Sequence, residues 1–264
     1  MKYTNMFRND KGVSEAIGFM LILGIMVTGI GLITLYGYPI LLQQQKDANV
    51  RNMERNMIVI QNDMNSLTFK NVPYKESSLQ VSGGTLSVTD PATYTHPYFT
   101  IRNSTDTMIS IFKPGDIRFN SDDGNAEIML ENGAVNLAYL NEGGSAMISE
   151  PRWYYDSSTQ TFVIYLIQVN KSDIGSSTVS NSVGNVQMIV TPLIPDIDQA
   201  PGGGNYIDVI YNYDTTNDFR QSWDNYFVNT LQMVKDNSTS PATYRMNNVQ
   251  RVVIKSYNIQ VLNV

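Results

Sequence analysis

The segment AIGFMLILGIMVTGIGLITLYGYPILL, residues 16–42, decides the architecture because it contains 27 residues in succession without a charged side chain. A helix of this length measures about 40 Å, which exceeds the roughly 30 Å hydrocarbon core of a bilayer. The segment includes five glycines, Gly18, Gly24, Gly29, Gly31 and Gly37. Glycines weaken an isolated helix in water but allow close helix approach in lipid or in a bundle. We therefore expect a membrane-spanning, helix-packing segment that bends near Pro39.

The residues before this segment determine its orientation and processing. Three basic residues, Lys2, Arg8 and Lys11, lie on its amino side, and the positive-inside rule then predicts a cytoplasmic amino end with the rest of the chain outside. An ordinary secretory signal is cut after its apolar stretch, whereas the small-residue junction here, at Gly12, precedes it. A cut after Gly12 would keep the helix and change the net charge of the chain from -6 to -8.

The sequence KGVSEAIG, residues 11–18, together with this order of parts, resembles the class III signal peptides of type IV pilins, most closely those of the archaeal branch. The resemblance extends over residues 1–45. It implies that a prepilin peptidase removes the leader 1–12, between Lys11-Gly12 and Val13. It also implies that helix 13–45 first lies in the membrane and then packs against identical or related subunits.

Glu15 departs from the family pattern. Bacterial members have a glutamate at the fifth mature position, whereas Glu15 would be the third residue after a cut before Val13. Two interpretations remain open. Glu15 pairs with the new amino terminus of Val13 at the helix start, where negative charge is favoured, or it is a solvated acid at the membrane surface.

An amphipathic extension of the helix is predicted over residues 46–70. Apolar residues recur there at spacings of three and four, at Val50, Met53, Met57, Ile60, Met64 and Leu67. Such a stripe is typical of a helix that packs along one side. Packing on the chain's own head and packing on neighbouring subunits are both compatible with it.

Residues 71–264 read as an extracellular head built from short strands, so the predicted fold class is α+β, with a mainly antiparallel, sandwich-like head and one packed helix. We expect a hairpin over Leu79–Val88 that turns at Gly83-Gly84, and a helix over Thr216–Val234. Turns are predicted at Lys113–Asp116 and at Glu131–Gly133. The other predicted strands are Tyr98–Arg102, Met108–Phe112, Asp116–Phe119, Glu127–Leu130, Ser145–Ile148, Thr161–Gln168, Val186–Val190, Tyr206–Tyr213 and Val249–Leu262.

No catalytic constellation is visible, so we do not expect an enzyme, a cofactor or a metal. The chain has no cysteine and one histidine, His96. A catalytic triad or a metal site would need further side chains of the right type beside that histidine. The acidic stretches Ser121–Glu127 and Asp196–Asp198 lack the ligand spacing of a calcium loop, and we interpret them as solvated turns. The glycine-rich stretch Pro201–Asn205 lacks the Lys-Ser/Thr of a phosphate loop.

The amino-acid composition argues against some classes of binding partner. An acidic chain is a poor nucleic-acid binder, so none is expected. The 27 aromatic residues, Trp153-Tyr154-Tyr155, Trp223 and Tyr226 among them, are expected to pack in the core rather than stack on a ligand. Three sequons mark asparagines for possible N-glycosylation, at Asn103, Asn170 and Asn237.

Two functions follow from these observations. The first is a major or minor structural subunit of a type IV pilus-like surface filament. The second is a pilin-like surface protein that stays in the membrane by its helix, while its head binds a solute or an envelope partner. A head of roughly 200 residues is large for an abundant pilin, which favours a minor subunit or the second function.

Overall fold

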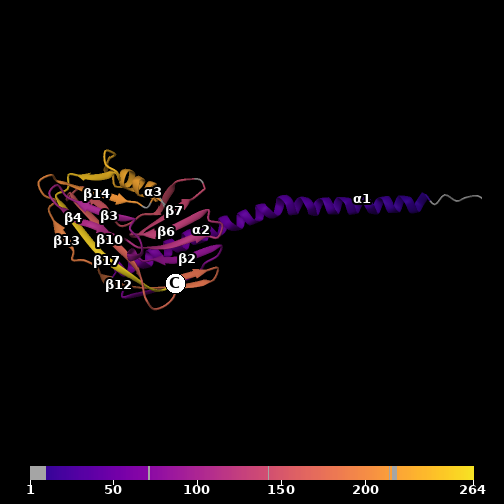
Figure 1. Ribbon diagram of the computed structural model, residues 1–264, viewed down its shortest axis with the longest axis horizontal. Coiled ribbons are helices and arrows are strands. Elements are labelled where there is room, and N and C mark those ends of the chain that lie inside the picture. Colours follow the sequence, from indigo (N-terminus) through magenta and orange to yellow (C-terminus); the bar gives the residue numbers. More distant parts are fainter. Residues whose placement is uncertain (1–9, 71, 142, 214, 216–218) are drawn as a thin grey trace, which may run out of the picture. The chain divides into compact units, whose positions relative to one another are not determined.

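The computed structural model describes residues 10–70, 72–141, 143–213, 215 and 219–264 (Figure 1). The predicted leader lies for the most part outside the described residues. The chain divides into two compact units, a helical unit that ends at Ala48 and a head unit, Asn49–Val264. The head unit therefore includes most of the amphipathic extension of the helix.

The helical segment is continuous from Asp10 to Phe69, through α1 (Asp10–Leu32), a π-helical segment η1 (Ile33–Gly37) and α2 (Tyr38–Phe69). The π segment lies directly before Pro39, which has no N–H to donate within the helix. The N–H of Tyr38 bonds the carbonyl of Ile33, five residues back. The helix therefore has one widened turn before Pro39 and is unbroken, and the bend expected near Pro39 stays a prediction.

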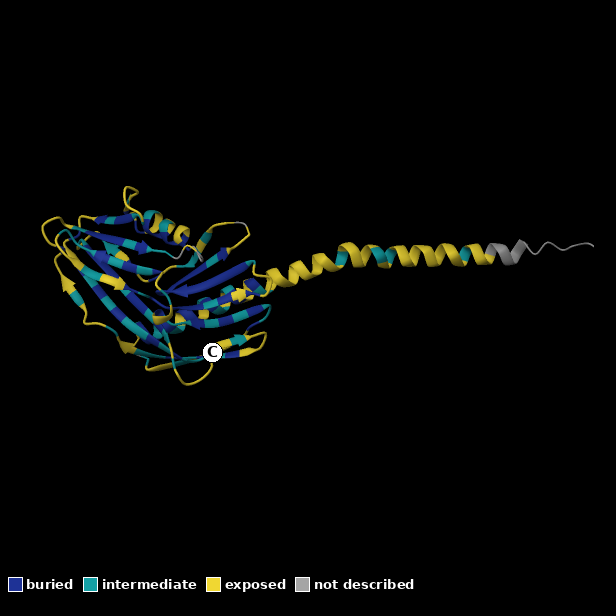
Figure 2. Cartoon of the chain, in the orientation of Figure 1, coloured by how far each residue is buried: buried dark blue, intermediate teal, exposed yellow. Residues whose placement is uncertain are grey.

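The apolar stripe of α2 is buried within the head unit, where all six predicted residues are at most 6% exposed. They form one hydrophobic cluster with buried side chains from the strands of the head. The interpretation in which the stripe packs on the chain's own head is thus confirmed. Figure 2 shows the contrast within the helix, since buried residues occur in the part of α2 inside the head, whereas residues 15–32 of α1 are mostly exposed.

The strands form three sheets in the described part of the chain. The first, which we call sheet A, has the order β1 (Tyr74–Gln80), β12 (Val183–Pro192), β17 (Arg251–Asn263), β10 (Thr161–Lys171) and β9 (Tyr154–Asp156), with β13 (Ile197–Gln199) also paired to β17. Sheet B has the order β11 (Thr178–Ser180), β2 (Gly84–Thr89), β5 (Asp116–Ser121), β6 (Ala126–Glu131), β7 (Ala134–Tyr139) and β8 (Ser145–Ser149). Sheet C has the order β15 (Val234–Asp236), β16 (Thr243–Asn247), β14 (Tyr206–Asn212), β3 (Tyr98–Arg102) and β4 (Thr107–Phe112).

Sheet A joins the two large cores of the head. Along β10, Ile164 and Leu166 belong to an aromatic core with sheet C, whereas Ile167 and Val169 belong to the core around α2. Successive residues of a strand point to opposite faces. Sheet C therefore packs on one face of sheet A near Ile164 and Leu166, and α2 packs on the opposite face near Ile167 and Val169. The α+β class with a mostly antiparallel β head is confirmed; the long β10–β17 pair is parallel.

The predicted hairpin over Leu79–Val88 is wrong. Strand β1 pairs with β12 in sheet A, whereas β2 pairs with β5 and β11 in sheet B. The segment between them crosses from one sheet to the other at the Asn49 end of the head's helix, since a side chain on Gly83 would meet Asn49. Both strands contribute apolar residues to the core around α2, so burial of the stripe outweighs local hairpin pairing.

The predicted helix over Thr216–Val234 is shorter in the structure. It consists of α3 (Arg220–Asn225) and a π-helical segment η3 (Tyr226–Thr230). Residues 216–218 lie outside the described residues, and Val234 begins strand β15. The chain leaves the helix at Gln232, whose φ of 57° is incompatible with a continuing helix.

Most of the other strands were predicted from the local sequence pattern, but several were missed. The nine further predicted runs all overlap strands, and the turn at Asn132-Gly133 joins β6 to β7 with φ angles of 49° and 76°, as a tight hairpin requires. Strands β7, β9, β11, β13, β15 and β16 were not predicted. Strand β7 has no alternating pattern because four of its six residues are buried. A short 3-10 helix, η2 (Pro91–Thr93), completes the elements.

Candidate membrane and assembly helix

The side chains of the apolar half of the helix are exposed in the described part of the chain. Large apolar side chains from Ile17 to Leu42 are between 38% and 71% exposed. Among the described residues, one helix is long and apolar enough to cross a membrane. The hydroxyls of Thr28 and Thr34 bond the carbonyls of Gly24 and Ile30 in the preceding turn, so neither hydroxyl needs water. The segment is therefore suited to an apolar environment.

The glycines of this half are not explained by contacts inside the chain. A side chain built at Gly18, Gly24, Gly29 or Gly31 would meet no atom within 4 Å. The head uses glycine differently, because a side chain on Gly84 would lie 2.4 Å from the carbonyl oxygen of Asn120. The helix glycines leave space that only a neighbouring helix or lipid can occupy.

The predicted processing residues lie at the start of this helix. The backbone of Lys11, Gly12 and Val13 belongs to α1, but their side chains lie outside the described residues. Glu15 is exposed. Its predicted pairing with a new amino terminus at Val13 stays a prediction, because the described chain carries residues before Val13.

Polar contacts fix the position of α2 in the head, and the sequence pattern did not reveal them. Gln61 is 3% exposed. Its Nε2 donates to the carbonyls of Gly133, at 2.6 Å, and Glu150, at 3.1 Å, and its Oε1 accepts from Ser149 Oγ at 2.5 Å. Because every polar atom of the amide is bonded, Gln61 sets the position of the helix along its axis as well as its rotation.

The carboxyl end of α2 is held by an aromatic cluster. The ring of Phe69 lies edge-on to Tyr165 at 4.8 Å and to Tyr257 at 6.1 Å. The guanidinium of Arg152 lies 4.4 Å from the centre of the Phe69 ring. These contacts add to the burial of the stripe at the end of the helix farthest from the apolar half.

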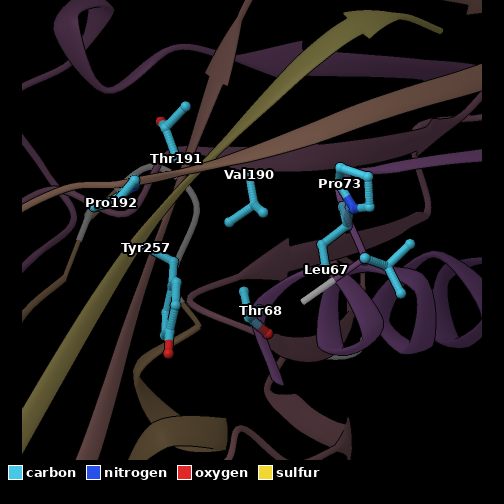
Figure 3. A pocket seen from close by; sticks show the side chains of 8 residues that line it. Leu67, Thr68, Pro73, Val190, Thr191, Pro192 and Tyr257 are labelled. Carbon is cyan, nitrogen blue, oxygen red and sulfur yellow. The ribbon is translucent and has the colours of Figure 1, made fainter. Parts of the chain in front are cut away.

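Next to this cluster lies an open cleft of about 280 Å³, lined by Leu67, Thr68, Val72, Pro73, Val190, Thr191, Pro192 and Tyr257. Figure 3 shows Leu67 and Thr68 at the end of the helix, with Val190 and Tyr257 on the strands beside them. The walls are mainly apolar, and the Thr68 hydroxyl is already bonded to the carbonyl of Met64. Burial raises the pKa of Tyr257, so its phenol is neutral. The lining residues therefore suit an apolar group.

The other sequence candidates lie apart from one another. His96 is exposed in a turn beside Tyr98. In the acidic turn after β5, Ser121 Oγ donates to Asp123 and accepts from the N–H groups of Asn125 and Ala126. This turn is closed by internal hydrogen bonds, and among the described residues no group of three or more His, Cys, Asp or Glu side chains is arranged to hold a metal.

The second acidic stretch is not the predicted turn, because Ile197 and Asp198 belong to strand β13, with both aspartates exposed. Asp196 pairs with Lys255 at 3.3 Å, and Asp198 pairs with Arg251. The pairing with Arg251 lowers the pKa of Asp198. Both carboxylates are thus used in surface ion pairs.

The predicted aromatic packing is confirmed for Trp153, Trp223 and Tyr226, which are at most 4% exposed. Tyr154 is the exception, at 45% exposed. The buried rings form the centre of the core between sheets A and C, where Trp153 and Trp223 lie 6.2 Å apart.

The three sequons differ in accessibility. Asn237 is exposed in the loop between β15 and β16. Asn103 is half-buried, and its Oδ1 accepts from the N–H of Thr105 and of Asp106, which shapes the loop between β3 and β4. Asn170 lies within β10, where its Nδ2 donates to Gln168 and Asn258. Glycosylation of folded protein is therefore easiest at Asn237 and most hindered at Asn170.

A protein-family model described as "Family of unknown function (DUF7289)" matches residues 11–261. No curated protein matches the chain. No solved structure matches it either.

Proposed function

We propose that this chain, which belongs to the DUF7289 family, is a structural subunit of a type IV pilus-like surface filament. It is inserted in the membrane through residues 13–45, clipped after Gly12, and assembled by packing of its helix against other subunits. Its partners are then the membrane, a prepilin peptidase and identical or related subunits.

The observation that supports this proposal most strongly is the contrast between a complete head and an incomplete helix. The stripe of α2 is buried inside the head, so the head needs no neighbour to cover it. The apolar half has exposed side chains on all sides, and a Cβ atom added at four of its five glycines would meet nothing within 4 Å among the described residues. Lipid can cover such a helix, and a bundle of subunit helices can replace that lipid.

The cleft beside Tyr257 favours a second candidate function, a membrane-retained surface protein whose head binds a solute. A cleft of about 280 Å³ with mainly apolar walls suits a small apolar ligand. Under this alternative the helix is a permanent anchor, and filament assembly does not occur.

Amino-terminal sequencing of the protein from membranes and from material sheared off the cell surface separates these functions. Val13 at the start of sheared protein supports the filament subunit. Val13 in membranes alone supports the retained surface protein. An intact Met1, or a cut after Leu42, contradicts processing of the pilin type.

A matched pair of variants tests the cleavage site itself. Gly12→Val should stop processing and leave the leader on the membrane protein, because the site before the helix requires a small residue. Gly18→Val places the same side chain beyond the cut, where an added Cβ atom meets nothing within 4 Å among the described residues, and should be processed normally. Processing of both variants at Val13 would contradict a peptidase that reads Gly12.

A further inference from the structure

Three acidic side chains and one arginine are buried together on the face of sheet B that points away from α2. Asp116 and Glu131 are direct partners across the β5–β6 pair. Glu127 and Arg118 lie farther along the same two strands and, by the alternation of strand side chains, on the same face. Asp116, Glu127 and Glu131 are at most 2% exposed. So many buried carboxyl groups are unfavourable unless each is paired or neutral.

Arg118 neutralises two of the three carboxylates. Its Nε and Nη2 donate to the two oxygens of Asp116, at 3.2 and 2.9 Å. Its Nη1 lies 2.8 Å from Glu127 Oε1. Burial opposes the charge of Arg118, but the neighbouring carboxylates outweigh burial and raise its pKa, so the arginine stays charged.

Glu131 is the one of the three carboxyl groups that forms no ion pair among the described residues. It is 0% exposed, and its Oε2 accepts a hydrogen bond from the Tyr211 hydroxyl on β14 at 3.2 Å. Its Oε1 has no hydrogen-bond partner. The indole N–H of Trp223 on α3 favours the charged form of Glu131 but makes no hydrogen bond of ordinary geometry.

The groups that face Glu131 from each packed element do not supply a positive charge other than Arg118. Asp116 on β5 is negative and directly opposite. Tyr211 on β14 and Tyr94, after η2, are phenols, and burial raises the pKa of Tyr94 so that it stays neutral. An ionised Glu131 would thus give the cluster three negative charges against one positive charge.

We propose that Glu131 is a proton-binding site, which holds a proton in the folded protein at neutral pH and makes the junction of sheet B, β14 and α3 sensitive to alkali. Burial, followed by the negative charge of Asp116, raises the pKa of Glu131 from the ordinary 4.5 to about 8. In an unfolded chain Glu131 releases its proton near the ordinary value. The stabilisation by the proton is therefore complete below pH 4.5, and it is lost as pH rises through about 8.

Infrared spectroscopy of the full-length chain in detergent micelles tests the proton directly. At pH 6 we expect the carbonyl stretch of a protonated carboxylic acid, which disappears on titration through pH 8 and is absent from Glu131→Gln. The control variant Glu76→Gln removes an exposed acid whose pKa is lowered by hydrogen bonds from Tyr74 and Asn185, and it should keep the band. Absence of the band from wild-type protein at pH 6 would overturn the proposal without any variant.

Unfolding equilibria measured against pH test the consequence for the fold. One proton held only by the folded state changes the unfolding constant about tenfold per pH unit. Between pH 5 and 8 the unfolding constant of wild type should rise more steeply than that of Glu131→Gln, by up to this tenfold factor per unit. Equal pH dependence of the two proteins would overturn the inference, whether or not the chain forms filaments.

Discussion

The two halves of the long helix share one backbone conformation and differ in almost everything else. Between Ile17 and Leu42 the large apolar side chains surround the helix and are exposed. From Val50 to Leu67 they occupy one stripe and are buried in the chain's own head. A helix that is apolar on all sides needs an environment from outside the chain, whereas a striped helix can be covered by its own domain.

The largest expected effect on unfolding is the difference between a substitution in the buried half of the helix and one in the exposed half. Met57→Ala should lower the free energy of unfolding of the head by about 2–5 kcal/mol, because a 0% exposed side chain leaves a cavity. Ile25→Ala removes a 71% exposed side chain and should change it by less than about 0.5 kcal/mol. Urea unfolding in detergent micelles, followed by fluorescence of the buried Trp153 and Trp223, measures both. Similar losses for the two variants would contradict the division of the helix.

The next effect concerns the polar contacts of α2. Gln61→Leu should cost about 1–3 kcal/mol, because the carbonyls of Gly133 and Glu150 lose their donor in a buried site. The same substitution at exposed Gln44 is the matched control and should have little effect on unfolding of the head. If Gln61→Leu is as stable as wild type, the amide does not fix the helix position.

A smaller effect is expected at the end of the helix. Arg152→Ala removes the guanidinium that lies 4.4 Å from the Phe69 ring, and should cost about 0.5–1 kcal/mol. Arg55→Ala, at an exposed position of α2, is the control. Thermal unfolding of the two variants, compared with wild type, would show whether the cluster around Phe69 stabilises the end of α2.

The smallest effect on the head is expected from the glycines of the apolar half. A Cβ atom added at Gly24 meets nothing within 4 Å in the described part of the chain, so Gly24→Leu should leave the urea unfolding of the head within about 0.5 kcal/mol of wild type. The same variant should reduce the yield of sheared filaments, because added bulk prevents close helix approach. Normal filament yield from Gly24→Leu would show that this glycine is not at a helix interface.

The local sequence pattern was sufficient to predict an element wherever the spacing of that element's own residues decides its structure. The apolar segment, the buried stripe of α2 and the tight turn at Asn132-Gly133 are all visible over short stretches of sequence. Pattern failed where strands choose partners. Leu79–Val88 has the residues of a hairpin, but its two strands join different sheets, because together they cover α2 more completely.

The candidate sites also divide into those that a short stretch of sequence reveals and those that depend on residues far apart in the chain. The processing junction and the sequons are short sequence words, so they could be found without a structure. Gln61 could not be singled out, because its partners Gly133 and Glu150 lie 72 and 89 residues away. The cleft beside Tyr257 joins residues from the end of α2, the connection to β1, and strands β12 and β17.

By itself, the sequence determined that this protein has a long apolar helix that is followed by a β-rich head. Those properties follow from local sums of hydrophobicity and from the spacing of neighbouring side chains. Only the tertiary structure decided that sheet A contains a parallel β10–β17 pair, that Gln61 is bonded on all sides, and that Asp116 faces Glu131. Pairing between distant strands is set by which arrangement buries the most apolar surface, and that is a property of the whole chain.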